Sequence, residues 1–207
     1  MRRRHFIAAG LAASYAGAAF AAPATVLVVG DSLSAEYGLR RGSGWVALLE
    51  RRIAGEKLDA RVVNASISGD TTSGGRSRLA PLLAQHQPTH VVIELGGNDA
   101  LRGLPLEMTQ SNLSAMVQAA QKAGARVLLV GIQLPPNYGA EYGNRFAALY
   151  EKVAREHKAA LVPFLLKGVA DIDDPTRLFQ ADRIHPNEQA QERMLANVWP
   201  ELRKLLK

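Results

Sequence analysis

The chain has 207 residues, of which 47% are hydrophobic and 21% are charged. This size and composition suit one globular domain and exclude both a disordered protein and a polytopic membrane protein. The net charge is +6, and without Arg2, Arg3 and Arg4 it falls to +3, with no Lys/Arg block among aromatics, which excludes a nucleic-acid-binding surface. The absence of cysteine excludes disulfides, a cysteine nucleophile and a lipoprotein anchor.

Residues 1–21 have the pattern of a signal peptide: arginines, an apolar run over residues 6–20, and small residues that fit cleavage after Ala21. An uncleaved membrane anchor is the alternative, but the run is short for a span and no stop-transfer signal follows it. The early arginines suit Sec export and twin-arginine export alike. We therefore expect a periplasmic or secreted protein, with residues 22–207 forming a single domain and no stable membrane insertion once the signal is removed.

Along the rest of the chain, short apolar runs alternate with longer segments whose apolar residues recur at helical spacing. The runs predict buried strands at Thr25–Gly30, Arg61–Ala65, His90–Leu95, Arg126–Ile132 and Ala160–Phe164. The longer segments predict helices at Trp45–Ile53, Arg76–His86, Met108–Lys122, Glu141–His157 and from about Asn187 onward. This order predicts an α/β fold, a three-layer αβα sandwich with a flavodoxin-like five-stranded parallel sheet and helices on both faces. Ligands of such folds bind beyond the carboxyl ends of the strands.

Directly after the first strand, the segment Gly-Asp-Ser-Leu-Ser places Ser32 at a predicted strand-to-helix turn, where a nucleophile belongs. A phosphate-cradling loop, as found after the first strand of flavodoxin-like proteins, suits the same five residues equally well. Ser34 stands where the G-x-S-x-G motif has its last glycine, which disfavours an ordinary α/β-hydrolase.

A serine hydroxyl needs a base to remove its proton, and His185 is the histidine best placed in the sequence to do so. Asp182 lies three residues upstream in an Asp-Arg-Ile-His-Pro turn, from which a carboxylate can orient the imidazole. The other histidines belong to the signal peptide, to helical patterns or to the start of a strand. The structural alternative is a helix-start turn capped by Asp182.

Acyl transfer also needs donors for the oxyanion that forms at the attacked carbonyl. The loop after the second strand offers the N–H of Gly69, where the missing Cβ allows close approach to a substrate. The loop after the third strand offers the side-chain amide of Asn98. Each loop alone is ordinary turn chemistry, but together with Ser32 and His185 they predict an acyl-transfer site.

These motifs resemble the SGNH, or GDSL, hydrolase family, and in particular its periplasmic thioesterase/arylesterase/lysophospholipase branch. The matching segments are VVGDSLSAEYGL, VVNASISGDTTSGG, HQPTHVVIELGGNDALRG, LPPNYG and DRIHPN, which fall in the family's order over almost all of residues 22–207. The resemblance implies a catalytic group of Ser32, Asp182 and His185. It also implies that the Ser32 N–H joins Gly69 and Asn98 in the oxyanion hole. Arg183 stands where relatives often have glycine, which leaves the Asp-x-x-His spacing intact.

The resemblance further implies an acyl-binding role for three leucines. The loop of residues 100–105, with Leu101, Leu104 and a glycine hinge at Gly103, would close over a bound acyl chain, and Leu134 would line the acyl pocket. Simple packing of these leucines onto the core is the alternative.

We therefore expect a monomeric serine hydrolase that cleaves small-molecule esters and thioesters, such as aryl esters, acyl-CoA-type thioesters and lysophospholipids, without a metal or organic cofactor. Two alternatives stay open. One is a carbohydrate O-acetyl esterase of the same family, and the other is a protein that binds acyl chains or phosphate without catalysis.

Overall fold

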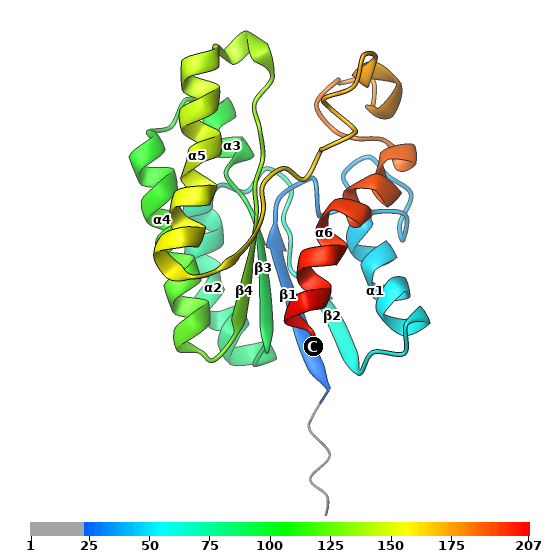
Figure 1. Cartoon of the computed structure of the whole chain (residues 1–207), viewed down its shortest axis with the longest axis vertical. Helices are drawn as coiled ribbons and strands as arrows, with labels where there is room; N and C mark the ends of the chain where they lie inside the picture. Colours follow the sequence, from blue (N-terminus) through cyan, green and yellow to red (C-terminus); the bar gives the residue numbers. More distant parts are fainter. Residues whose placement is uncertain (1–22) are drawn as a thin grey trace, which may run out of the picture.

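The computed structural model describes residues 23–207, and the predicted signal peptide lies outside this range. A five-stranded, fully parallel sheet runs through the middle of the molecule in the order β2-β1-β3-β4-β5 (Figure 1). Its strands are β1 (Ala24–Gly30), β2 (Ala60–Asn64), β3 (His90–Glu94), β4 (Arg126–Val130) and β5 (Ala160–Val162). The predicted α/β fold with a five-stranded parallel sheet is confirmed.

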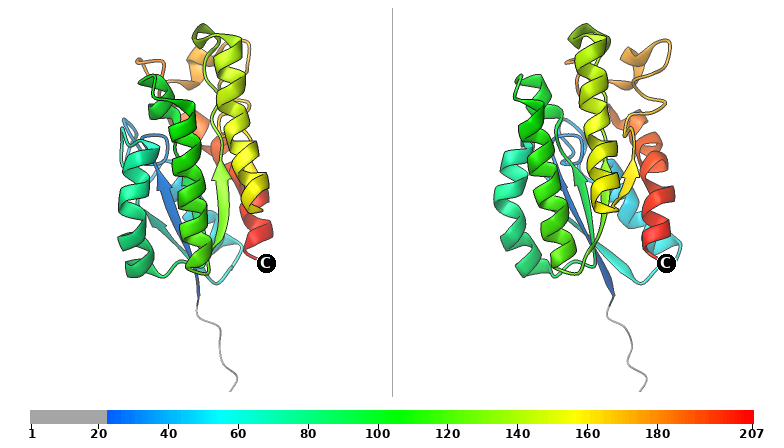
Figure 2. Two further views of the ribbon diagram at one scale, coloured as in Figure 1. Left: turned by 90° about the vertical axis from the view of Figure 1, so that its left-hand side faces the viewer. Right: turned by 60° about the vertical axis from the view of Figure 1, so that its left-hand side comes forward.

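Helices cover both faces of the sheet, as the three views in Figures 1 and 2 agree. On one face lie α2 (Thr72–His86), α4 (Leu106–Lys122) and α5 (Ala140–His157). On the other face lie α1 (Trp45–Gly55) and α6 (Gln191–Leu205). Short helical segments complete the fold: α3 (Gly97–Leu101) and the 3₁₀ turns η1 (Pro136–Tyr138), η2 (Pro175–Leu178) and η3 (Glu188–Ala190). Within residues 23–207 no helix is long and apolar enough to span a bilayer.

The core lies between these layers because the two central strands are apolar on both faces. Residues 26–29 of β1 and 91–93 of β3 are fully buried, as continuous Val/Ile/Leu runs in a parallel sheet should be. Strand β2 forms an edge of the sheet and is only partly buried. From β1 the chain adds β2 on one side and then returns to add β3 on the other, so the connections diverge at the carboxyl end of β1. Such a switch point is where doubly wound folds bind their ligands.

The observed elements differ from the predicted ones mainly at their ends. Helix α2 begins at Thr72, four residues before the predicted start, because the Thr71 side chain caps it by accepting a hydrogen bond from the Gly74 N–H. Short helix α3 was not predicted, since five residues are too few for a helical periodicity. No helix follows Ser32 directly: residues 32–38 form turns, and α1 begins only at Trp45.

Candidate active site

The predicted nucleophile and the predicted base meet at the carboxyl end of the sheet. The Ser32 hydroxyl, directly after β1, lies 2.9 Å from Nε2 of His185. The other ring nitrogen of His185, Nδ1, lies 2.6 Å from Oδ2 of Asp182. The structure therefore joins Ser32, His185 and Asp182 in one hydrogen-bonded chain, although Ser32 and His185 are 153 residues apart in the sequence.

A tight turn before α6 holds His185 in place. Oδ1 of Asp182 accepts hydrogen bonds from the backbone N–H groups of Ile184 and His185, at 2.9 and 3.0 Å. Partial burial alone would raise the pKa of Asp182, but the hydrogen bonds from the His185 side chain and from these two N–H groups lower it from 3.8 to about 2. The Asp182 side chain therefore caps this turn and remains ionised at neutral pH. Helix capping falls instead to Asn187, which caps η3.

Arg183 occupies a strained position inside the same turn. Its φ of 56° lies in the left-handed region, which glycine adopts at no steric cost and which costs other residues about 1–2 kcal/mol. Its backbone N–H donates to the carbonyl of Gln180, which closes the turn. The Gln180 N–H in turn donates to the carbonyl of His185 at 2.8 Å. The backbone on both sides of the imidazole is therefore fixed by hydrogen bonds.

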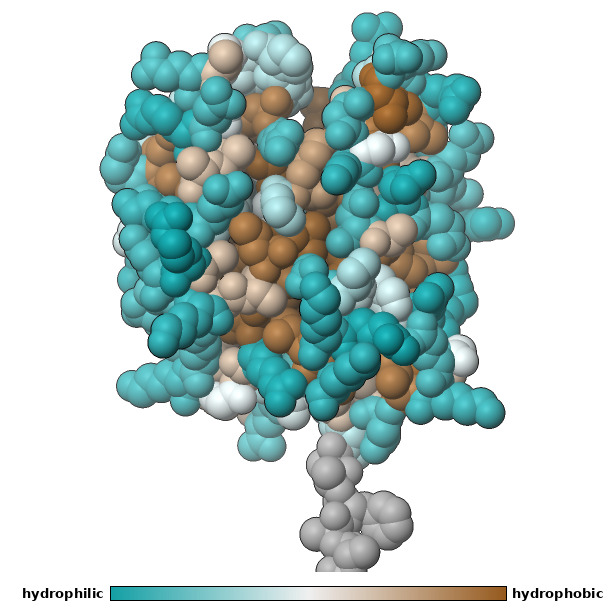
Figure 3. All heavy atoms as spheres, in the orientation of Figure 1, coloured by the Kyte–Doolittle hydropathy of each residue, from teal (hydrophilic) through white to brown (hydrophobic). Residues whose placement is uncertain are grey.

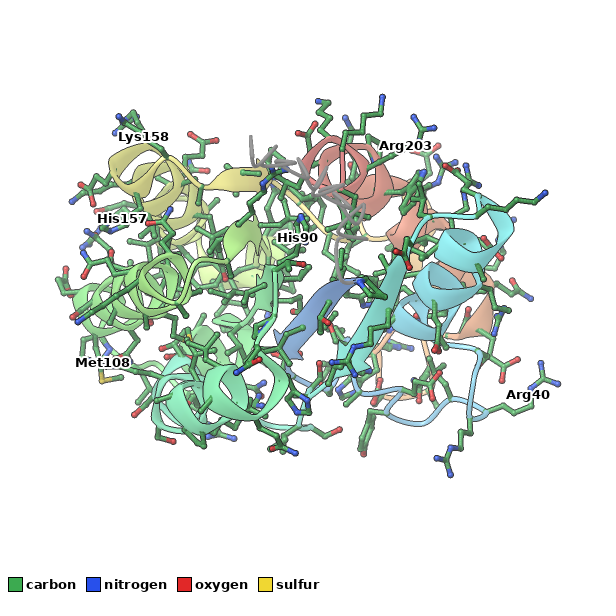
Figure 4. The ribbon with its side chains drawn as sticks, turned by 90° about the horizontal axis from the view of Figure 1, so that it is seen from below. Arg40, His90, Met108, His157, Lys158 and Arg203 are labelled. Atoms are coloured by element: carbon green, nitrogen blue, oxygen red, sulfur yellow. The ribbon has the colours of Figure 1, made fainter. Side chains whose placement is uncertain are left out.

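The other histidines in the described part of the chain lie at the opposite end of the sheet. His86 ends α2 and His157 ends α5. His90 begins β3, and its Nε2 lies 2.9 Å from the carbonyl oxygen of Leu205 in α6. Figure 4, seen from that end, shows His90 in the interior and His157 near the rim. This arrangement leaves His185 as the described histidine that faces Ser32.

The loops with the predicted oxyanion donors flank the nucleophile turn, because β2 and β3 are the two neighbours of β1. Gly69 has a φ of 79°, a conformation that suits glycine, and its loop is tied to β1 by a hydrogen bond from the Ile67 N–H to the Gly30 carbonyl. Within residues 23–207, the N–H groups of Gly69 and Ser32 donate to no protein acceptor.

Asn98 lies in α3, on the other side of β1. Its Nδ2 donates to Oδ2 of Asp31 at 2.9 Å, which uses one N–H of the amide and leaves the second. A phosphate-cradling loop is not supported here, because the residues after β1 do not lead into a helix N-terminus, which starts only at Trp45.

The three predicted acyl-binding leucines lie at this end of the molecule, Leu101 as the last residue of α3 and Leu104 and Leu134 in loops, and their environments differ. Leu101 is exposed, whereas Leu104 is half-buried. Leu134 is half-buried and packs against the core. Gly103, the predicted hinge, has a φ of 63°. Their acyl-binding role remains a prediction.

Two surface grooves lie elsewhere. One of about 240 Å³ runs between α4 and α5, and one of about 340 Å³ borders the loop after β2, with Ser66 and Ile67 in its lining. Neither is lined by Ser32, Asp182 or His185. A separate notch opens at the upper end of the molecule, between the start of α5 and the segment that leads to α6 (Figures 1 and 3). Within residues 23–207, no three His, Asp or Glu side chains are grouped closely enough to hold a metal ion.

The sequence analysis assigned no role to several side chains that surround the site. The ring of Tyr37 lies 4.4 Å from that of His185, between centroids. Gln180 links the segments that carry Ser32 and His185, since its Nε2 donates to the carbonyls of Tyr37 and Pro186 at 2.8 and 3.2 Å. Arg102 donates to the carbonyl of Gly69 at 2.8 Å. Apart from the bond between Gln180 and Pro186, which are six residues apart, these contacts join residues far apart in sequence, so no local pattern signals them.

Two buried carboxyl groups lie behind the nucleophile turn. Burial raises the pKa of Asp31 to about 6, against the opposing effect of hydrogen bonds from the Leu33 N–H and Asn98. Burial, and then the neighbouring charge of Asp31, raises the pKa of Glu94 well above its ordinary value. The sequence does mark Glu94 as unusual, because it is the one acidic residue in the apolar run His-Val-Val-Ile-Glu-Leu.

A sequence profile of the GDSL-like lipase/acylhydrolase family matches residues 28–193. The chain therefore belongs to this family and is a serine hydrolase that cleaves esters. Esterase TesA of Pseudomonas aeruginosa is 56% identical over 186 residues, which cover 90% of this chain and 91% of that relative. The Escherichia coli protein named thioesterase 1/protease 1/lysophospholipase L1 is 44% identical over 171 residues, which cover 83% and 79%. A crystal structure of TesA matches with a TM-score of 0.84 and 56% identity, covering 87% of this chain and 99% of that one.

Proposed function

We propose that the enzyme hydrolyses acyl esters and thioesters through an acyl-enzyme on Ser32, with His185 as the base and Asp182 as the residue that orients it. The observation that carries this proposal is the hydrogen-bonded chain from the Ser32 hydroxyl through both ring nitrogens of His185 to Asp182. Because a carboxylate only accepts hydrogen bonds, Asp182 fixes the proton of neutral His185 on Nδ1. Nε2 is then free to accept the serine proton.

The reaction has two steps. Ser32 Oγ attacks the carbonyl carbon while His185 takes its proton, and the tetrahedral intermediate expels the alcohol or thiol, which leaves with that proton. Water then attacks the acyl-enzyme, again losing its proton to His185. The bond from the carbonyl carbon to Ser32 Oγ breaks, the carboxylic acid departs, and the serine regains its proton. No step requires a metal or an organic cofactor.

The N–H groups of Ser32 and Gly69 and the Asn98 amide are the proposed oxyanion donors. Among residues 23–207 the two backbone N–H groups have no acceptor, and hydrogen-bond donation from the Asn98 amide to Asp31 uses only one of its two N–H groups. Donors held in place before the reaction stabilise the oxyanion without the reorganisation that water would need.

The proposed substrates are small molecules with an acyl chain: aryl esters, acyl-CoA-type thioesters and lysophospholipids. Two observations support them. The apolar residues Leu101, at the end of α3, and Leu104 and Leu134, in loops, lie at the carboxyl end of the sheet. The Escherichia coli relative is named a thioesterase and lysophospholipase. An O-acetyl esterase acting on carbohydrates does not need to bind a long acyl chain. Rates on esters with acyl chains from two to sixteen carbons separate the two functions, because each buried methylene contributes about 0.8 kcal/mol.

The decisive experiment combines labelling with hydrolysis. A fluorophosphonate probe should label Ser32 in the folded wild type, and Ser32→Ala should abolish both the labelling and the hydrolysis of an aryl ester and an acyl thioester. Labelling of another residue, or full hydrolysis by Ser32→Ala, would refute the assignment of Ser32.

We also propose that the signal peptide is removed after Ala21 and that residues 22–207 act as a monomeric single domain in the periplasm or outside the cell. The arginines and the apolar run of residues 6–20 support export. N-terminal sequencing of the protein recovered from the periplasm and medium should begin at Ala22, and light scattering should give the mass of one chain. An uncleaved chain that fractionates with membranes would contradict the first proposal.

A further inference from the structure

Two buried carboxyl groups at the carboxyl ends of β1 and β3 take no part in the steps described above. Asp31 is 3% exposed and Glu94 is 0% exposed. Glu94 is the register partner of Gly30, so both groups lie directly behind the turn that carries Ser32. An ionised carboxyl group in such a place costs free energy, which its hydrogen bonds must offset.

The two oxygens of Asp31 hold different parts of the site. Oδ1 accepts from the N–H of Leu33 at 3.0 Å, within the nucleophile turn. Oδ2 accepts from Nδ2 of Asn98 at 2.9 Å, in α3, which follows the neighbouring strand β3. One rigid carboxyl group therefore connects the backbone next to Ser32 to the side chain proposed to bind the oxyanion.

Glu94 supports Asp31 from behind. Its Oε2 accepts from the Ser34 hydroxyl at 2.6 Å and lies 3.5 Å from the Asp31 backbone nitrogen. These groups fill the space over Gly30, where a Cβ would lie 2.7 Å from Ser34 Oγ and 2.8 Å from Glu94 Oε2. Glu94 Oε1 is buried without a hydrogen-bond partner among residues 23–207. A carboxyl group in that position is neutral, so the pair carries one negative charge, and that charge resides on Asp31.

The remaining ionisable groups around Asp31 come from three other elements. Asp70, in the loop after β2, is paired with Arg78 of α2 at 2.7 Å. Tyr150 of α5 is buried and donates its hydroxyl to the Leu95 carbonyl. His185, in the segment before α6, lowers the pKa of Asp31 through its charge when the imidazole is protonated.

We propose that Asp31 is a positioning residue whose carboxylate sets the orientation of the Asn98 amide. A carboxylate only accepts hydrogen bonds, so it must face the amide nitrogen, which leaves the second N–H of that nitrogen for the oxyanion. Protonation of Asp31 makes one of its oxygens a donor, and the amide then turns to present its oxygen. An amide oxygen turned toward the site repels the oxyanion, which the N–H of the same amide would stabilise. This inference rests on the proposed function, because it assigns a role through Asn98.

The test is the acid limb of kcat/KM with an uncharged aryl ester. In the wild type His185 must be neutral to act as the base. The loss of a further proton from Asp31, whose pKa is about 6, adds a gain on the order of 10- to 100-fold. The acid limb of log kcat/KM should therefore be steeper than one and approach a slope of two. Asn98→Ala has no amide to orient, so its slope should fall to one. Asp31→Asn should also give a slope of one, with kcat lower by on the order of 10- to 100-fold and KM within about twofold.

A double-mutant cycle and a matched variant complete the test. Asp31→Asn should cause little further loss of kcat in the Asn98→Ala background, because both changes remove one interaction. Asp99→Asn replaces a buried carboxylate that accepts from the Thr72 backbone N–H and hydroxyl, outside the site. Because the role of Asp99 is structural, Asp99→Asn should lower the Tm but keep the wild-type slope of two in the acid limb of log kcat/KM.

Additive losses, or an Asn98→Ala acid limb with the wild-type slope, would overturn the positioning role of Asp31. The Asn98→Ala comparison remains decisive even where Asp31→Asn does not fold. Failure of the proposed function is a separate outcome: the wild type would not hydrolyse the ester, or Ser32→Ala would retain activity.

Discussion

Tyr37 and His185 face one another beside the nucleophile turn, with ring centroids 4.4 Å apart and ring planes inclined by 40°. Tyr37 is 50% exposed, so the part of its side chain that does not contact the imidazole is open to solvent. A contact between two such rings contributes about 0.5–1.5 kcal/mol, enough to favour one orientation of the imidazole.

Tyr37→Ala should therefore lower kcat by up to about 10-fold, because the imidazole loses the ring that restricts it. Tyr37→Phe keeps the ring and should behave like the wild type. Steady-state kinetics on one aryl ester measure both variants. An equal loss in Tyr37→Phe would assign the effect to the hydroxyl group instead.

Asn98→Ala should reduce kcat by about 10²- to 10³-fold while KM stays nearly constant, because an oxyanion donor acts in the transition state and not on the bound ester. Asn64→Ala is a suitable control, since Asn64 donates its amide to the Ser34 carbonyl at 2.8 Å in the same region but faces no proposed oxyanion. Unchanged turnover in Asn98→Ala would remove Asn98 from the mechanism.

Asp182→Asn should reduce kcat by about 10⁴-fold, because an amide can hold the imidazole in the wrong tautomer.

The ionisation of Asp182 should also make the stability of the protein depend on pH. The pKa of Asp182 falls from 3.8 to about 2 in the folded protein, so its contribution to the free energy of unfolding is present above pH 3.8 and is lost as the pH falls toward 2. Denaturant titrations should show the difference between wild type and Asp182→Asn shrinking over this window. If the difference in the free energy of unfolding between wild type and Asp182→Asn stayed constant with pH, ionisation of Asp182 would not be the cause of that difference.

Arg183→Gly should stabilise the protein by up to about 1 kcal/mol, because relief of the left-handed backbone exceeds the entropy that glycine adds to the unfolded chain. Lys158 provides the matched control, because its φ is 52° and it caps the end of α5 just before β5, at the end of the sheet opposite the site. Figure 4 shows Lys158 at the rim of that end. Lys158→Gly should give a similar gain in thermal denaturation. A loss of stability in Arg183→Gly alone would show that the arginine side chain makes a stabilising contact.

The sequence predicted the sheet and the serine, histidine and aspartate segments because these depend on local patterns. Buried strands are continuous apolar runs, and the loops that follow them carry the polar residues. Strand ends were less predictable, because Ile132 and Phe164 continue the buried core beyond the last residues of β4 and β5.

The supporting side chains could not be predicted in the same way. Gln180 and Tyr37 meet across 143 residues, and Asp31 meets Asn98 across 67. Such contacts depend on which strands become neighbours, and a linear pattern does not contain that information. Glu94 could have been singled out, because an acidic residue in a buried strand requires a specific partner.

The order of the site residues along the chain has a consequence for biosynthesis. The proposed nucleophile Ser32 is made early, whereas the proposed base His185 lies just before the last helix, and the two meet only when α6 has packed onto the sheet beside α1. A nascent chain still attached to the ribosome, or one kept unfolded during transport, therefore carries a serine without its base. Such a chain cannot consume the acyl esters of the compartment in which it is made.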